Sequence, residues 1–120
     1  MKRRLPILVI LFFCSTLVLS QDKLQLIPQP ASVINGKGNF SFTASTKIIA
    51  NEMAAPVAEW LQSFLKKQTK YNTTIVKSGA GNTIQLLLNK VKNEKTGNEG
   101  YQLSVNTNVI KIKANEPAGL

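Results

Sequence analysis

Residues 53–69 read MAAPVAEWLQSFLKKQT and contain the clearest structural pattern of the chain. Four apolar residues recur at helical spacing, namely Val57, Leu61, Phe64 and Leu65. This spacing predicts an amphipathic helix with one apolar stripe, which must be buried against other elements. Pro56 fits the first turn, because the N–H that proline lacks would have no acceptor there. Three lysines lie at the carboxyl end, where their charge favours the helix dipole: Lys66, Lys67 and Lys70.

Seven short segments around this helix have strand patterns. They are residues 31–35, 39–43 and 47–50 before it and residues 73–76, 83–89, 101–105 and 110–114 after it. Gly36-Lys37-Gly38 predicts a turn between the first two segments, and Asn106-Thr107-Asn108 predicts a tight hairpin turn, since Asn tolerates the left-handed conformation. Polar and apolar residues alternate along most of these segments. We therefore expect an α+β fold, a mainly antiparallel sheet with one principal helix packed on one face.

The inventory of reactive side chains is small. The 120 residues, enough for one domain, include no His and one Cys. This excludes a Ser-His-Asp or Cys-His catalytic group, a His-ligated zinc site, a thiolate metal cluster and an internal disulfide. Asp22 is the only Asp, and the Glu residues are scattered over Glu52, Glu59, Glu94, Glu99 and Glu116. We therefore predict no catalytic, cofactor-binding or metal-binding residue in this chain, and no cofactor.

Residues 1–20 have the pattern of a secretory signal peptide. Lys2, Arg3 and Arg4 precede the apolar run 5–13, and Val18-Leu19-Ser20 places small residues at the third and first positions before Gln21. We expect residues 21–120 to be the mature domain, exported to the periplasm or the extracellular space.

Two other readings of this leader are less favoured. A retained membrane anchor would need about 20 apolar residues, more than the run provides. Lipidation of Cys14 normally requires a small preceding residue, and Phe13 is bulky. We therefore expect no stable membrane span and no lipid anchor after cleavage.

The positive charge does not indicate nucleic-acid binding. Loss of the leader lowers the number of basic residues from 15 to 12 against 6 acidic ones, a net charge of +6. All of the remaining basic residues are Lys, spread from Lys23 to Lys113, whereas nucleic-acid recognition favours Arg and clustered basic faces with stacking aromatics. The pattern predicts a solvated lysine-rich surface and no nucleic-acid partner.

Three short motifs resemble a known family. They are Leu26-Ile27-Pro28-Gln29-Pro30, the run from Glu99 to Val105 (EGYQLSV) and the run from Ala114 to Leu120 (ANEPAGL). Their order, with a helix of matching size between them and a signal peptide before them, resembles the N-terminal, non-catalytic domain of family 20 glycoside hydrolases, the β-N-acetylhexosaminidases of secreted bacterial type. The resemblance covers nearly all of residues 24–120. It implies a small α+β domain followed by a catalytic (β/α)8 barrel in the same polypeptide, which would be its partner.

The chemistry implied by the resemblance belongs to that barrel. Such enzymes remove terminal N-acetylhexosamine residues from glycans with retention, the acetamido oxygen of the substrate acting as nucleophile. An adjacent Asp-Glu pair assists, and this chain contains no such pair. We therefore expect a fragment without activity of its own, which meets glycan only through the barrel. The helical spacing of Trp60 indicates packing rather than a sugar platform.

Two alternative functions stay open. The chain could be a stand-alone periplasmic binding or interaction module, or an accessory domain of another glycan-degrading barrel enzyme. Residues 116–120 read like the start of a helix, so we expect a longer protein. We also expect the sheet face opposite the predicted helix, with Leu87 and Val109, to be covered by a barrel or by a helix after Gly119.

Overall fold

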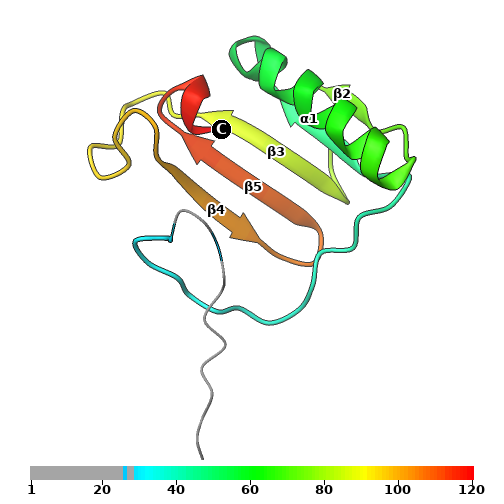
Figure 1. Ribbon diagram of the computed structural model, residues 1–120, viewed down its shortest axis with the longest axis horizontal. Coiled ribbons are helices and arrows are strands. Elements are labelled where there is room, and N and C mark those ends of the chain that lie inside the picture. The colour runs from blue at the N-terminus through cyan, green and yellow to red at the C-terminus, as the bar shows by residue number, and fades with distance from the viewer. Residues whose placement is uncertain (1–25, 27–28) are drawn as a thin grey trace, which may run out of the picture. The chain divides into compact units, whose positions relative to one another are not determined.

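The computed structural model describes Leu26 and residues 29–120, so the predicted signal peptide and most of the proline-containing segment after it lie outside the described residues. The elements are β1 (Lys47–Ala50), the 3-10 turn η1 (Glu52–Ala54), α1 (Ala55–Thr69), β2 (Thr74–Val76), β3 (Thr83–Leu88), β4 (Tyr101–Val105), β5 (Val109–Ala114) and the 3-10 turn η2 (Pro117–Gly119). They form one five-stranded sheet with α1 on one face (Figure 1). The prediction of an α+β fold with one principal helix is confirmed.

The predicted direction of the strands is wrong for most of the sheet. The strand order is β2-β1-β3-β5-β4. β1 runs parallel to β2 and to β3, and β3 runs parallel to β5, so only the β4–β5 pair is antiparallel. Alternation of polar and apolar residues indicates that the two faces of a strand differ. The direction of a strand relative to its neighbour depends instead on the segment that connects them. Here α1 crosses between β1 and β2, and such a crossover returns the chain in the same direction.

Two predicted strands are absent, because residues 31–35 and 39–43 have no strand conformation in the structure. Phe40 and Phe42 still pack against the core, so their predicted burial is partly correct. This segment has no neighbouring strand, and the side chain of Asn82 forms hydrogen bonds to it. Its Nδ2 donates to the Ser41 carbonyl at 2.7 Å, and its Oδ1 accepts from the Thr46 hydroxyl at 2.6 Å.

The helix begins and ends close to the prediction. Asn51 Oδ1 accepts from the Ala54 N–H at 3.0 Å at the start of η1, and Pro56 lies in the first turn of α1 as expected. At the other end Lys70 adopts a left-handed φ of 65°, and its N–H donates to the Lys66 carbonyl. This left-handed residue closes the helix in the usual way.

The core lies between α1 and the sheet. It contains six buried apolar residues, namely Ile48, Ala50, Ala54, Ala58, Ile84 and Leu86. Val57, Leu61 and Leu65 of the predicted stripe pack against it, but Phe64 is 46% exposed. Ala54 and Ala58 are fully buried, which brings the backbone of η1 and α1 close to the sheet.

The predicted hairpin is confirmed, but its turn forms differently. The Asn106 side-chain oxygen accepts from the N–H groups of Asn108 and Val109 at 2.9 and 2.7 Å. Among the described residues, Lys70 is the only non-glycine residue with a positive φ, so no Asn of this turn is left-handed. The turn is stabilised by an Asn side chain that bonds to the backbone two and three residues ahead.

Asn115 holds the long loop between β3 and β4. Its side chain is buried, and its Oδ1 accepts from Asn89 Nδ2 at 2.9 Å and from the Asn93 N–H at 2.8 Å. Its Nδ2 donates to the carbonyls of Asn93 and Gly97 at 2.8 and 2.6 Å. Every hydrogen-bonding position of this amide is therefore used, and the loop is fixed against the end of β5.

Candidate interaction surface

The five glutamates, which lie in the part of the chain that the structure describes, do not come together as an active site. Glu52 forms an exposed ion pair with Lys77 at 3.3 Å, and Glu116 pairs with Lys92 at 2.8 Å. The other three lie on exposed positions, Glu59 on α1 and Glu94 and Glu99 in the loop before β4. In the part of the chain that the structure describes, no three potential metal ligands form a group, and no helix is long and apolar enough to cross a membrane.

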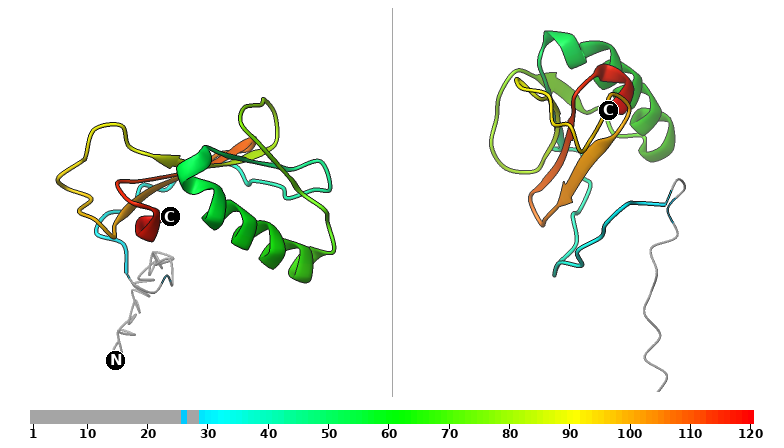
Figure 2. Two further views of the ribbon diagram at one scale, coloured as in Figure 1. Left: turned by 90° about the horizontal axis from the view of Figure 1, so that it is seen from above. Right: turned by 90° about the vertical axis from the view of Figure 1, so that its left-hand side faces the viewer.

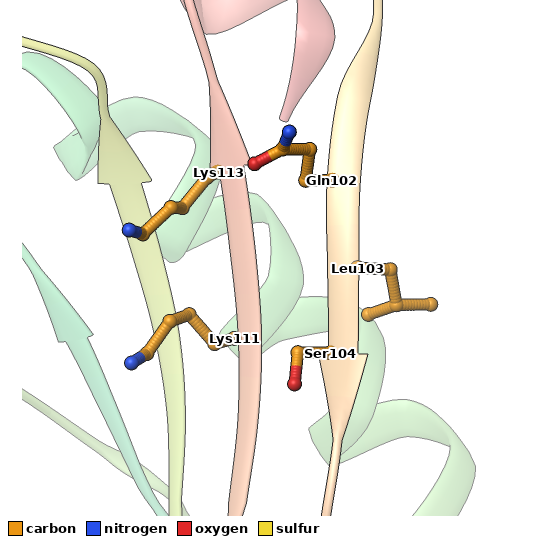
Figure 3. A pocket seen from close by; sticks show the side chains of 5 residues that line it. All are labelled: Gln102, Leu103, Ser104, Lys111 and Lys113. Carbon is orange, nitrogen blue, oxygen red and sulfur yellow. The ribbon is translucent and has the colours of Figure 1, made fainter. Parts of the chain in front are cut away.

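On the part of the chain that the structure describes, two shallow hollows are lined by lysines. One lies beside the carboxyl end of α1 and is lined by Ser63, Lys66, Lys67 and Lys70. The other lies over β4 and β5, where Lys111 and Lys113 extend toward β3 while Leu103 points away from them (Figure 3). Gln102 and Ser104 complete that lining. Neither hollow is lined by a carboxylate, so neither offers a carboxyl group for acid–base catalysis.

The most distinctive surface is apolar and lies on the helix-bearing face. Cross-strand neighbours form rows across this face, and the rows become more exposed toward β4. One row runs through Ile48, Ile84, Ile110 and Val105, and the next runs through Ala50, Leu86, Ile112 and Leu103. Exposure rises from 0% at Ile48 to 53% at Val105, and from 1% at Leu86 to 49% at Leu103. The same face is therefore core at one end and open at the other.

The position of α1 explains this gradient. The helix packs on β1 and β2, the two strands at one edge of the sheet. It leaves β5 and β4, at the other edge, uncovered in the view of Figure 1. η2 lies on the same face of the sheet as α1 (Figure 2), where it packs at the end of β5 and close to Gly100. There it buries Ala114 completely, whereas the partner of Ala114 on β4, Tyr101, is 50% exposed.

One flank of α1 continues the apolar surface. Trp60 and Phe64 stack with ring centroids 5.5 Å apart and planes 12° apart, and Trp60 is 66% exposed. Gln62 marks the opposite flank, since its Nε2 donates to the Thr73 carbonyl beside the edge strand β2. At 100° per residue, Trp60 and Phe64 lie about 160° around the helix from Gln62. Phe64, about 60° around the helix from the half-buried Leu61, therefore lies on the flank toward the open half of the sheet, whereas Trp60, about 160° from the fully buried Ala58, is turned largely to solvent.

We call this set of exposed side chains the uncovered apolar face: Trp60, Phe64, Tyr101, Leu103 and Val105. It bears on two sequence predictions. Trp60, predicted to be a packing residue, stacks on Phe64 but is otherwise exposed. Leu87 and Val109, expected to be the apolar residues in need of cover, are both half-buried, and the larger exposed apolar surface lies on the helix-bearing face.

A comparison with family models decides what this domain is. Residues 23–120 match the model described as glycosyl hydrolase family 20, domain 2. The chain belongs to glycosyl hydrolase family 20. The resemblance seen in the three sequence motifs is thereby confirmed, as the match extends over residues 23–120.

Solved structures give the same result for this family 20 domain. The chain is similar to the GH20 β-N-acetylhexosaminidase from Streptomyces coelicolor A3(2), with 29% sequence identity and a TM-score of 0.66. The match covers 77% of this chain and 18% of the Streptomyces protein. A comparison with curated protein sequences gives no significant match. The family 20 domain thus spans about a fifth of the length of its structural relative.

Proposed function

We propose that this chain is the accessory domain of an exported β-N-acetylhexosaminidase, an enzyme that hydrolyses terminal non-reducing N-acetylhexosamine residues of glycans. The observation that carries the proposal is the match of residues 23–120 to domain 2 of family 20, together with the similarity to a family 20 hexosaminidase. The catalytic groups belong to a barrel that follows in the same polypeptide. The domain meets glycan only through that barrel.

The side chains of the domain support a non-catalytic role. A family 20 mechanism uses the substrate's acetamido oxygen as nucleophile, so the protein must supply a carboxylic acid beside the scissile bond. The five glutamates are spread over η1, α1, the loop before β4 and the residue before η2, and two of them are engaged in ion pairs with lysines. A general acid also needs a pocket that holds the sugar, and the two hollows contain lysines without a carboxylate.

The basic n-region, the short apolar run and the small residues before Gln21 support export. A signal peptide at residues 1–20 would deliver the protein to the periplasm or the extracellular space.

Hydrolysis of chromogenic N-acetylglucosaminides and N-acetylgalactosaminides tests this function. We expect turnover by the full-length protein and none above background by the 120-residue chain. Glu99→Gln serves as a control, because replacing this loop carboxylate should leave the full-length rate unchanged. Turnover by the short chain that is abolished by Glu99→Gln would overturn the non-catalytic role, and a full-length protein inactive on every N-acetylhexosaminide would overturn the proposed parent activity.

A further inference from the structure

All of the charged residues in the strands lie on the sheet face opposite α1. The five strands contain no Asp or Glu, and their basic residues are Lys47 of β1 and Lys111 and Lys113 of β5. Each lysine is adjacent in sequence to an isoleucine that packs in the core on the α1 side. Successive side chains of a strand point to opposite faces, so these lysines share the face away from α1.

Most neighbours of these lysines on the same face are polar. In the register, Lys111 lies between Gln85 of β3 and Ser104 of β4, and Lys113 lies opposite Gln102. Gln102, Ser104 and Lys113 are exposed, and they line the shallow hollow of about 200 Å³ over β4 and β5. Lys111 and Lys113 extend toward the central strand β3 (Figure 3). The lysine face is the name we give to the surface formed by Lys47, Gln85, Gln102, Ser104, Lys111 and Lys113.

The lysines of this face form no ion pair within the part of the chain that the structure describes. The ion pairs found there join Lys77 to Glu52 and Lys92 to Glu116, and none of these residues belongs to the lysine face. The other three glutamates lie on α1 or in the loop before β4. The lysine face therefore combines unneutralised ammonium groups with amide and hydroxyl donors. This combination suits a ligand with several anionic oxygen atoms, such as a phosphate group.

We propose that the lysine face docks reversibly on an anionic phospholipid surface, with lipid phosphate groups bound by its ammonium groups. The arrangement of the charges favours this partner. Lys111 and Lys113 are about 7 Å apart along one strand, and Lys47 lies two strands away, about 10 Å across the sheet. The charges therefore cover an area, as the headgroups of a bilayer do, rather than a line.

A nucleic acid fits this face less well than a bilayer. The strand positions on the lysine face include no aromatic residue, so bases find no side chain on which to stack. Its cations are lysines, which act as point charges toward phosphate, whereas base recognition favours the planar fork of arginine. The lysine face therefore suits phosphate groups presented without a base.

The number of lysines predicts weak, salt-dependent docking. One lysine beside an anionic bilayer strengthens binding roughly fivefold, so the three together give about 100-fold. Stable anchoring takes a second signal, so a face of this charge binds and releases. Such docking needs no membrane-spanning helix, and none is found in the described part of the chain. The proposed export would bring the protein to the outer face of a membrane.

Sedimentation with lipid vesicles tests the proposal on the full-length protein that begins at Gln21, so that the apolar leader takes no part. We expect binding to phosphatidylcholine vesicles with about 30% phosphatidylglycerol, and none to phosphatidylcholine alone. Raising NaCl from about 0.1 M to about 0.5 M should release the protein. Equal binding to both kinds of vesicle would overturn the proposal. So would release by inorganic phosphate at constant ionic strength, or binding to soluble polygalacturonate without binding to anionic vesicles, because the ligand would then be a free anion or a polymer.

Two double variants that remove the same net charge form a matched pair. Lys111→Gln with Lys113→Gln should weaken vesicle binding about 25-fold, whereas Lys66→Gln with Lys67→Gln, on α1, should change it less than about twofold. Equal weakening by the two pairs would assign the attraction to net charge and overturn the proposal. Lys111→Arg with Lys113→Arg should retain binding, since the charge is kept.

A substitution at an exposed position keeps the test valid if the β5 variants fail to fold. Ser104→Glu places a carboxylate opposite Lys111 on the edge strand, and it should also abolish vesicle binding. Circular dichroism checks that each variant is folded, and a folded Ser104→Glu protein that binds as well as the unsubstituted one would overturn the proposal. These measurements use neither turnover nor export. Failure of the proposed function is therefore distinguishable from failure of this inference.

Discussion

Leu103 of β4 lies directly opposite Ile112 of β5 on the same face of the sheet, yet the two side chains have different surroundings. Ile112 packs against the core, whereas Leu103 is 49% exposed. The difference reflects the position of α1, which covers one side of the sheet and leaves the edge strand β4 without a helix. The Leu103–Ile112 pair thus marks the boundary between the buried core of the domain and the exposed apolar surface of its sheet.

Substitutions to Ala should lower the unfolding free energy more at a fully buried residue than at a half-buried one. Leu86→Ala removes a side chain that is 1% exposed, and we expect a loss of about 2–5 kcal/mol of unfolding free energy. Leu61→Ala removes a half-buried side chain of α1, so the loss should be smaller. Urea unfolding of the 120-residue chain measures both. Equal losses would show that α1 is packed as tightly as the centre of the sheet.

Asn115 should be the most sensitive polar residue described here. Asn115→Ala leaves the Asn93 and Gly97 carbonyls and the Asn93 N–H without their partner. Water reaches the exposed Gly97, so the main loss arises at the half-buried Asn93, where an unpaired group costs at most about 1–3 kcal/mol. We expect a loss of stability and faster hydrogen exchange in residues 89–97. Asn98→Ala, at an exposed position of the same loop, is the control and should change neither quantity. Unchanged exchange in Asn115→Ala would mean that the loop is held by other contacts.

Gly119 should not tolerate a side chain. Gly119→Ala places Cβ within 3 Å of the Gly100 carbonyl oxygen and Ala114 Cβ, so backbone must move. Overpacking of this kind costs about 1–3 kcal/mol. Gly36→Ala is the matched control, because nothing lies within 4 Å of its Cβ position. Thermal unfolding of the two variants compares them, and a stable Gly119→Ala would show that η2 is loosely seated.

Trp60 should behave as a surface residue in this chain. It is the only Trp and is 66% exposed, so its fluorescence should have the long-wavelength emission of a solvated indole and be quenched readily by iodide. Trp60→Ala should cost about 1 kcal/mol or less, well below the 3–5 kcal/mol of a buried Trp, because only its stack with Phe64 is lost. A short-wavelength, unquenched emission would contradict the exposed position of α1's aromatic flank.

The leader gives a prediction about processing. If Val18-Leu19-Ser20 precedes the cleavage site, the exported protein begins at Gln21. Mass spectrometry of the N-terminal peptide decides this. A membrane-bound protein that retains Met1 would instead indicate an uncleaved anchor.

The sequence by itself determined those features that depend on neighbouring residues. The apolar spacing around Leu61 and the position of Pro56 predicted α1, and alternation on both sides of Asn106 predicted the β4–β5 hairpin. The absence of His and of an Asp-Glu pair removed most catalytic chemistries from the chain, and short motifs indicated the family. These signals are local, since periodicity along a segment states which of its sides is apolar.

Only the tertiary structure decided how these elements meet. The parallel pairing of β1 with β2 and β3 arises from hydrogen bonds between residues far apart in the sequence. The same holds for the segment around Phe42, where the Asn82 side chain replaces a strand partner, and for the aromatic flank of α1, which is open because the helix sits at one side of the sheet. An apolar pattern fixes the side of an element that avoids water, whereas the element that covers that side is selected by non-local packing.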